Sequence, residues 1–229
     1  AEKVTISANW TINSNRLTYL VDGAATNDSG NVVYNTAVTL PTEPTKDGYT
    51  FSGWLRDGVK AENFDMPDEA VTISGTFTAN EDTEYTIETY LQNLDGTYPT
   101  TASSSTTGHG KTDTEATATA ETIEGFTFDA DNTNNVLRGN IAGDGSLVLK
   151  LYYTRNSYDV EYTYTNAPEG ATTLPVKTSY KYGATVTVAD KAASITGYTV
   201  GDWNRTGTFT MPAEKVTISA NWTINSNRL

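Results

Sequence analysis

Short runs in which apolar and hydroxylic residues alternate are the main pattern along this chain of 229 residues. Residues 71–77 read VTISGTF, with apolar side chains at every second position apart from one glycine. Residues 216–222 repeat that spacing, and residues 147–151 place leucine at every second position. Since side chains alternate between the two faces of a strand, this period of two predicts strands with one buried face.

Turn residues separate these runs. Asp95-Gly96 and Asp144-Gly145 are pairs that tolerate the positive φ of tight hairpin turns. Two prolines within residues 41–45 exclude a helix interior or a central strand there. The alanine-rich residues 114–121 carry enough threonine to favour a strand or an irregular segment. We therefore expect a predominantly β fold, α+β at most, with little helix.

The two ends of the chain have the same sequence. Residues 1–17, AEKVTISANWTINSNRL, recur without change as residues 213–229, which gives a period of 213 − 1 = 212 residues. Near-identical repeats are typical of proteins in which each copy stacks on or follows its neighbour. We therefore expect the chain to be a window of a tandem array, with residues 1–15 as the terminal strand and linker of a preceding repeat.

A weaker repetition lies within this period. Residues 48–54 read GYTFSGW and residues 197–203 read GYTVGDW, and FDMP or FTMP follows each of them. These segments define module A (residues 16–80) and module A′ (residues 157–229, which include the start of a further repeat). Residues 81–156 form module B, which has its own Gly-Phe-Thr-Phe.

Small sheets are the expected form of each module. A module of this size buries only about 60% of its chain surface, so contacts with neighbouring modules should add support. We expect tandem antiparallel sheets in an elongated arrangement, with cores built on aromatic and methionine residues. These core residues are Tyr49, Trp54, Phe64, Met66, Phe77, Phe126, Tyr198, Trp203, Phe209, Met211 and Trp222.

Module A resembles a known repeat family. Its Gly-Tyr-x-Phe-x-Gly-Trp, its Phe-x-Met-Pro and its final Val-Thr-Ile strand are similar to the Listeria–Bacteroides repeat of the internalin B-repeat type. Module A′ departs from that motif at Val200 and Asp202. In module B, the run YLQNLDG from Tyr90 to Gly96 resembles the MucBP-like modules of Gram-positive adhesins. The resemblance implies β-grasp-like folds in a cell-wall-anchored bacterial surface protein, acting outside the cell as a stalk or adhesin.

Composition excludes several classes of function. The net charge is −13, and nucleic-acid binding requires basic clusters. No segment reaches the roughly 18 apolar residues of a membrane span, so membrane insertion is not expected. The chain has no cysteine, which excludes disulfides, zinc–thiolate sites and cysteine nucleophiles. A cysteine-free, acidic, threonine-rich chain is typical of bacterial extracellular repeats.

Candidate chemistry is sparse, and we expect neither catalysis nor a cofactor. The one histidine, His109, lies among glycines in a predicted loop, without the fixed acid that a triad needs. The best candidate for Ca²⁺ is the run Asp129, Asp131, Asn132 and Asn134, which lacks the glycine and the distal glutamate of an EF-hand. An ordinary polar loop is the preferred interpretation. Lys150, considered for an isopeptide bond, is expected to point outward.

Two functions remain open. The first is a spacer that presents a distal adhesive head, with neighbouring repeats as partners. The second is an adhesive module that binds mucin-type glycans or a host protein through multivalent weak sites. Its sugar-binding candidates are Tyr152, Tyr153, Tyr158, Tyr162, Tyr164, Tyr180 and Tyr182.

Residues 1–12 carry an apolar face that has no place in their own repeat. We expect them to be disordered, to pair with an open sheet edge, or to replace residues 214–223 of a neighbouring molecule in a strand swap.

Overall fold

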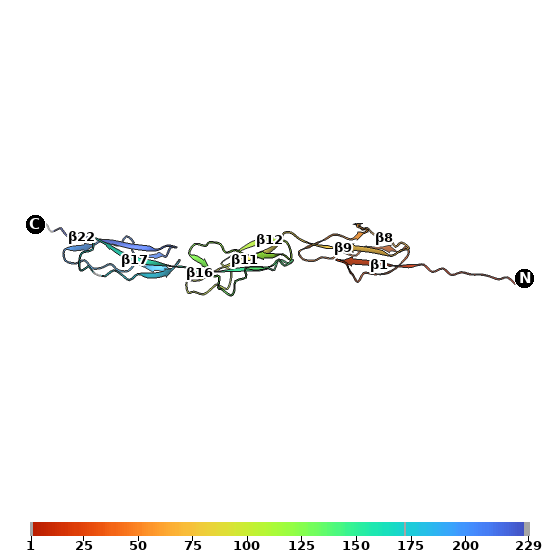
Figure 1. Cartoon of the computed structure of the whole chain (residues 1–229), viewed down its shortest axis with the longest axis horizontal. Coiled ribbons are helices and arrows are strands. Elements are labelled where there is room, and N and C mark those ends of the chain that lie inside the picture. The colour runs from red at the N-terminus through yellow and green to blue at the C-terminus, as the bar shows by residue number, and fades with distance from the viewer. Residues whose placement is uncertain (1, 172, 227–229) are drawn as a thin grey trace. The chain divides into compact units, whose positions relative to one another are not determined.

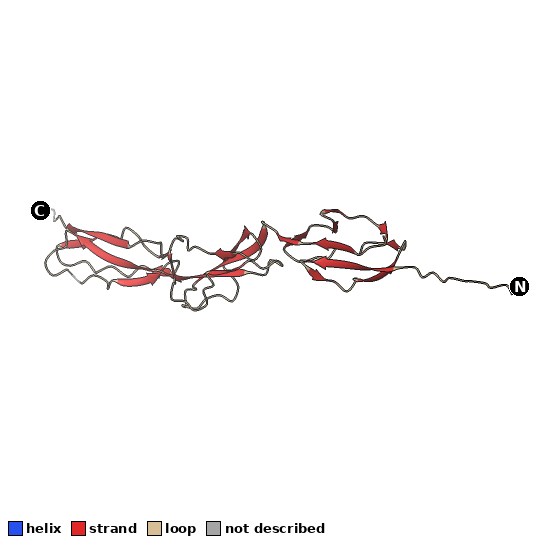
Figure 2. Cartoon of the chain, turned by 45° about the vertical axis from the view of Figure 1, so that its right-hand side comes forward, coloured by secondary structure: helices blue, strands red, loops and turns tan. Residues whose placement is uncertain are grey.

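Strands are the regular secondary structure of the described residues. The computed structural model describes residues 2–171 and 173–226, and within them there is no helix, as Figure 2 shows. The prediction of a predominantly β fold is confirmed. The chain divides into two compact units, which are described separately. Unit 1 consists of Ala1–Tyr85, Gly108–Ala116 and Asn140–Leu147, and unit 2 consists of Thr86–Thr107, Thr117–Gly139 and Val148–Leu229.

Module A, which lies in unit 1, is a mixed sheet with short flanking pairs. The sheet has the order β2-β1-β9-β6-β7, β3 also pairs with β1, and β5–β10 and β4–β8 form two-stranded sheets. The strands are β1 (Ser14–Val21), β2 (Ala24–Ala25), β3 (Gly30–Val33), β4 (Ala37–Val38), β5 (Tyr49–Phe51), β6 (Leu55–Arg56), β7 (Val59–Lys60), β8 (Phe64–Asp65), β9 (Val71–Gly75) and β10 (Phe77–Ala79).

Module A′, which lies in unit 2, contains a four-stranded sheet of order β18-β17-β22-β20 and the pair β19–β21. Its strands are β17 (Ser157–Thr165), β18 (Thr178–Lys181), β19 (Thr185–Thr187), β20 (Tyr198–Val200), β21 (Thr208–Thr210) and β22 (Val216–Ile224).

Module B contributes residues to both units. It has a sheet of order β12-β11-β16-β14 and the pair β13–β15. Its strands are β11 (Thr83–Leu91), β12 (Ser104–Gly110), β13 (Glu115–Thr117), β14 (Phe126–Phe128), β15 (Arg138–Asn140) and β16 (Val148–Arg155).

One strand pairing recurs in all three modules. The first long strand runs parallel to the last, in β1–β9, β11–β16 and β17–β22. A short strand that begins at the aromatic residue of Gly-aromatic-Thr pairs antiparallel with the end of the last strand in β14–β16 and β20–β22, and with β10, which follows β9, in module A. Module B therefore shares the strand pairing of modules A and A′ although its sequence motifs differ. Each module is a mixed sheet around a parallel pair rather than a purely antiparallel one.

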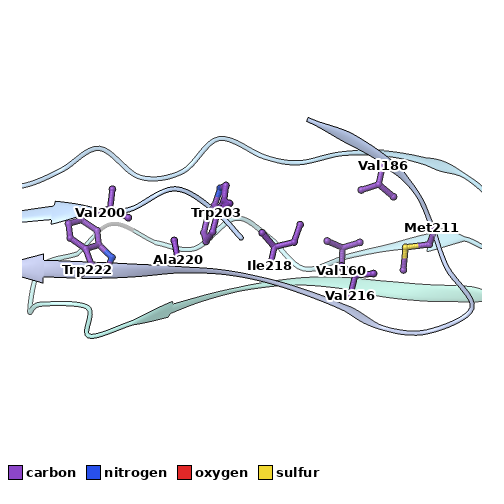
Figure 3. Close-up of a cluster of buried hydrophobic side chains, with 9 residues drawn as sticks. All are labelled: Val160, Val186, Val200, Trp203, Met211, Val216, Ile218, Ala220 and Trp222. Atoms are coloured by element: carbon purple, nitrogen blue, oxygen red, sulfur yellow. The ribbon is translucent and has the colours of Figure 1, made fainter. Parts of the chain in front are cut away.

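Alternation places one face of these strands in a core. In module A′ the buried residues gather along β17 and β22 (Figure 3), and they are Val160, Val186, Val200, Trp203, Met211, Val216, Ile218, Ala220 and Trp222. The core of module A consists of Leu17, Tyr19, Val38, Trp54, Met66, Val71 and Ile73. Among the expected core residues, both methionines and Trp54, Trp203 and Trp222 are buried. The remaining ones are half-buried, namely Tyr49, Phe64, Phe77, Phe126, Tyr198 and Phe209.

The duplicated sequence has two different structures. Residues 2–13 belong to no strand, and Figure 1 shows them as the coil that precedes β1. Trp10 is 94% exposed there, whereas Trp222, its equivalent in β22, is 2% exposed. The expected pairing of this segment with an open sheet edge is therefore not seen, and the strand swap stays a prediction about two molecules. Residues 227–229 of the second copy lie outside the described part of the chain.

The two buried indoles of module A′ differ in hydrogen bonding. The Nε1 of Trp203 donates to the carbonyl of Ala189 at 3.0 Å. The buried Nε1 of Trp222 has no hydrogen-bond partner among the described residues. A buried donor without a partner costs about 1–3 kcal/mol, so phenylalanine at position 222 should regain much of what the smaller ring loses.

We expect Trp222→Phe to lower the unfolding free energy of module A′ by about 1 kcal/mol less than Trp203→Phe does. Trp203→Phe removes a made hydrogen bond and leaves the Ala189 carbonyl unpaired. Hydrogen exchange of the β22 amides measures the local unfolding of this module in each variant. A larger loss for Trp222→Phe than for Trp203→Phe would contradict the prediction.

A charged cluster covers the outer face of β17. Lys177 Nζ lies 2.6 Å from Asp159 Oδ2 and 3.3 Å from Glu161 Oε1, and Lys215 Nζ lies 2.8 Å from Glu161 Oε2. The bond from Lys177, followed by one from Ser179, lowers the pKa of Asp159. Bonds from Lys215 and Lys177 lower the pKa of Glu161, and the bond to Asp159 raises the pKa of Lys177.

Module A′ should therefore lose some stability in acid. Carboxyls with a lowered folded pKa contribute stability above their unfolded pKa of about 4, and that contribution is lost as pH falls through the folded value. The raised pKa of Lys177 acts in the other direction, with its contribution lost in strong alkali. We expect the double variant Lys177→Met, Lys215→Met to show a weaker pH dependence of β22 hydrogen exchange below about pH 4 than the parent chain. Since both lysines of the cluster are exposed, 1 M salt should also reduce the difference. An identical pH profile for the variant would refute this role.

Candidate functional site: the module junctions

An asparagine holds the junction between modules A and B. The backbone N–H of Asn80 donates to the Gly48 carbonyl at 2.8 Å, and Thr50 Oγ1 donates to Asn80 Oδ1 at 2.7 Å. From module B, the backbone N–H of Thr112 donates to the Asn80 carbonyl at 2.9 Å. We call these three hydrogen bonds around one asparagine the junction clamp. All of them lie within unit 1.

The junction between modules B and A′ repeats the clamp within unit 2. The N–H of Asn156 donates to the Gly125 carbonyl at 2.9 Å, and Thr127 Oγ1 donates to Asn156 Oδ1 at 2.7 Å. The N–H of Tyr182, from module A′, donates to the Asn156 carbonyl at 2.8 Å. The same three kinds of group are therefore paired in the same way at both junctions.

Further contacts reinforce each clamp. At the first junction, Thr112 is 1% exposed, and its Oγ1 donates to the Gly48 carbonyl at 2.8 Å. At the second, Arg155 Nη1 donates to the Tyr182 carbonyl at 2.9 Å, and the rings of Tyr182 and Phe126 meet edge to face at 5.9 Å. Module docking therefore uses backbone groups at both junctions and different side chains at each.

Glycine is required where the modules touch. Gly48 and Gly125 have φ of 75° and 77°, in the left-handed region that glycine adopts readily. A Cβ on Gly125 would lie 2.1 Å from the ring of Tyr182, and one on Gly48 would lie 2.3 Å from the Cα of Gly143. The neighbouring module occupies the place of the missing side chain at both sites.

The connections between modules are short. Strand β16 ends at Arg155 and β17 begins at Ser157, so Asn156 is the whole connection between modules B and A′. Strand β10 ends at Ala79 and β11 begins at Thr83. Few backbone torsions remain free at such a connection, and the clamp restricts those of the asparagine itself.

The asparagines were not singled out from the sequence. A usable signal exists, because an asparagine stands at each expected module boundary and a Gly-aromatic-Thr triplet precedes each one by about 30 residues. Module B carries this triplet as Gly125-Phe126-Thr127, in common with modules A and A′. The signal is weak on its own, since two of the three bonds at each asparagine use backbone atoms that every residue has.

The other candidate residues lie apart from the junctions or serve packing. His109 lies on strand β12 rather than in the predicted loop, and its Nδ1 is 3.1 Å from Asp82 Oδ1 on the exposed surface. Lys150 is half-exposed, with its Nζ 3.7 Å from Glu88 Oε2. Of the tyrosines considered for sugar binding, Tyr152 and Tyr153 are buried, and the others are half-buried. Tyr164, for example, stacks on Trp203 with ring centroids 5.1 Å apart.

The calcium candidate is a loop with internal hydrogen bonds. Asp129 Oδ2 accepts from Tyr98 Oη at 3.0 Å and from Asn132 Nδ2 at 3.2 Å, while Asn132 Oδ1 accepts from the N–H of Asn134 at 3.0 Å. Asp131 is exposed. Burial, followed by the bond to Asp129, raises the pKa of Tyr98 to about 12. Within residues 2–171 and 173–226, no group of three or more acidic, histidine or cysteine side chains is placed to hold a metal.

The same described residues contain no helix that is long and apolar enough to span a membrane.

Two family models match the chain. The Listeria–Bacteroides repeat domain matches residues 16–80, and the divergent InlB B-repeat domain matches residues 160–226. These segments correspond to modules A and A′, and the predicted resemblance to this repeat type is confirmed.

Several curated relatives match at the sequence level, and two of them show the range of the similarity. A protein described as "Putative membrane protein" from Evansella cellulosilytica is 26% identical over 252 residues, which cover 100% of this chain and 36% of that protein. Internalin H of Listeria monocytogenes is 36% identical over 105 residues, which cover 42% of this chain and 19% of internalin H. The chain thus spans little more than a third, at most, of these relatives.

Solved structures also show similarity to this chain. Streptococcal High Identity Repeats in Tandem (SHIRT) domains 3–4 from a cell surface protein share 15% identity at a TM-score of 0.25, covering 62% of this chain and 98% of that one. The Bacillus anthracis TIE protein shares 11% identity at a TM-score of 0.38, and the match covers 93% of this chain and 51% of that one. The type 2 repeat of the mucus binding protein MUB from Lactobacillus reuteri shares 12% identity at a TM-score of 0.15. That match covers 93% of this chain and 99% of the other. At TM-scores this low, the similarities assign no role to module B or to the whole chain.

The clamp geometry predicts which glycine substitutions loosen a junction. Gly125→Ala adds both positive-φ strain and a clash with Tyr182, whereas Gly207→Ala adds the strain alone, because Gly207 has φ of 75° and nothing within 4 Å of an added Cβ. We expect Gly207→Ala to cost about 1 kcal/mol and Gly125→Ala to cost more, with faster hydrogen exchange of the Tyr182 amide. Equal exchange of that amide in the two variants would show that the contact at Gly125 does not hold the junction.

Proposed function

The chain contains a Listeria–Bacteroides repeat at residues 16–80 and a divergent InlB B-repeat at residues 160–226, and from this premise we propose that it is a non-enzymatic spacer unit of a bacterial cell-surface protein. The spacer extends a distal adhesive part of the protein away from the cell. In this proposal the protein is extracellular and attached to the cell wall of a Gram-positive bacterium through segments other than this one.

The parallel pairing of first and last strands is the observation that carries the proposal. Strands β17 and β22 run in the same direction, with Val160 opposite Val216 and Thr165 opposite Asn221. The chain therefore enters module A′ at one end of the sheet and leaves it at the other end. The same holds for β1–β9 and β11–β16. Entry and exit at opposite ends of each sheet is the geometry that a spacer needs.

The junction clamps and the charge support the same function. Each clamp contains three hydrogen bonds, of which one crosses to the next module, and each bond has a net value of about 0.5–1.5 kcal/mol. The net charge of −13 on this chain opposes collapse of one part of an array onto another. Repulsion between units and bonding at the junctions both favour extension.

The adhesive alternative stays a prediction. The tyrosines considered for it are buried or half-buried and contribute to module packing. A glycan array probed with this chain would test it directly.

Small-angle scattering of this chain and of a chain with two 212-residue periods tests the spacer. We expect the maximum dimension of the two-period chain to increase by the full length of one period, because each module passes the chain from one end of its sheet to the other. High salt screens the repulsion between units but leaves the uncharged clamp bonds in place, so it should shorten that dimension only slightly. A two-period chain no longer than the single one would refute the spacer.

A further inference from the structure

Module A′ ends in the same arrangement that precedes each junction. The N–H of Asn225 donates to the Gly197 carbonyl at 2.9 Å, and Thr199 Oγ1 donates to Asn225 Oδ1 at 2.7 Å. These are two of the three bonds of a junction clamp. The residues correspond to Asn156, Gly125 and Thr127 at the junction of modules B and A′.

The missing type of bond is found at the start of module A. There the N–H of Tyr34 donates to the carbonyl of Asn13 at 2.9 Å. Asn13 stands in the first copy of the duplicated sequence where Asn225 stands in the second, since 225 − 13 = 212. Asn225 therefore makes two of the bonds of a clamp, and its sequence equivalent Asn13 makes the third.

Module A receives this bond in the same way as modules B and A′. The residue after the donor has positive φ in each case, with 62° at Asn35, 67° at Asp113 and 78° at Gly183. The N–H of Asn35 donates to the Met66 carbonyl at 2.8 Å, and that of Gly183 donates to the Met211 carbonyl at 2.8 Å. Tyr34 is thus the counterpart of Tyr182 and Thr112.

The residues of these two half-clamps are more exposed than the corresponding residues of the clamp between modules B and A′. Tyr34 is 49% exposed, and Tyr182 is more deeply buried than that. Gly197 has φ of 82°, is exposed, and has nothing within 4 Å of an added Cβ, while Gly125 is buried against Tyr182. Each half thus exposes the surface that the other would cover.

We propose that Asn225, Gly197 and Thr199 of one period bind Tyr34 of the module A that follows, and that they form a third junction clamp between consecutive periods. The partner is a second copy of module A, and the inference rests on the proposed spacer function. The Tyr34 ring covers Gly197, as the Tyr182 ring covers Gly125. All three kinds of junction in the array are then held by the same bonds.

A chain with two periods tests the clamp by pulsed electron paramagnetic resonance. Because the natural chain has no cysteine, two introduced cysteines carry the only spin labels. One pair of labels is placed at Thr187 of the first module A′ and at Val59 of the second module A, and both positions are exposed. A reference pair of labels is placed at Ser105 and Thr187 of the first period, on either side of the junction of modules B and A′.

We expect the distance distribution across the A′–A junction to be as narrow as the reference distribution. Gly197→Ala in the first period should broaden the A′–A distribution and leave the reference unchanged, and Gly125→Ala should do the reverse. Tyr34→Ala in the second period should also broaden only the A′–A distribution. In the single 229-residue chain, Gly197→Ala should cost no more stability than Gly207→Ala, which shows that the variant folds.

Two results would overturn the third clamp. One is a broad A′–A distribution in the parent two-period chain beside a narrow reference distribution. The other is an A′–A distribution that Gly197→Ala and Tyr34→Ala both leave unchanged. Either result could accompany a fully extended chain in scattering, in which case the spacer would stand without this clamp. A compact two-period chain with a narrow A′–A distribution would support the clamp and contradict the spacer.

Discussion

Parallel pairing between the first and last strands is the constraint on which the rest of the structure depends. A parallel pair requires a crossover connection, and in these modules all the intervening strands form that connection. The register of β17 on β22, from Val160 with Val216 to Thr165 with Asn221, fixes where the chain enters and leaves the sheet. In module B, the antiparallel pairing of β14 with β16, with Phe126 opposite Arg155, places the Gly125 carbonyl beside Asn156, the asparagine that ends the module. The junction is therefore a product of the module's own topology.

Backbone bonding at the junctions explains why the docked residues differ. Thr112, Tyr182 and Tyr34 have unlike side chains but donate the same N–H to an asparagine carbonyl. What must be kept is the asparagine side chain, whose oxygen accepts from a threonine, and the glycine, which combines positive φ with close approach. Side chains around this fixed set are then free to vary, as the edge-to-face contact of Tyr182 with Phe126 and the hydroxyl bond of Thr112 illustrate.

Local patterns predicted the strands but not their partners. Alternation in residues 71–77 and 216–222 correctly indicated β9 and β22, because a buried face imposes a period of two. Nothing local distinguishes a parallel from an antiparallel partner more than 50 positions away. The clamps were missed because backbone atoms carry most of their bonds. The duplicated segment shows the limit most directly, since residues 4–10 lie in coil while the identical residues 216–222 form β22. Packing against module A′, which only the second copy has, decides the outcome.

The single-residue connection at Asn156 has a mechanical consequence. A pull along the chain passes from the end of β16 to the start of β17 through one residue, so it acts directly on strand ends. Because β17 and β22 are parallel, tension enters at the first end of one strand and leaves at the last end of the other. The load therefore shears the hydrogen bonds between these strands together instead of opening them one after another. A module with this topology therefore resists a pull along the chain with its whole hydrogen-bonded ladder at once.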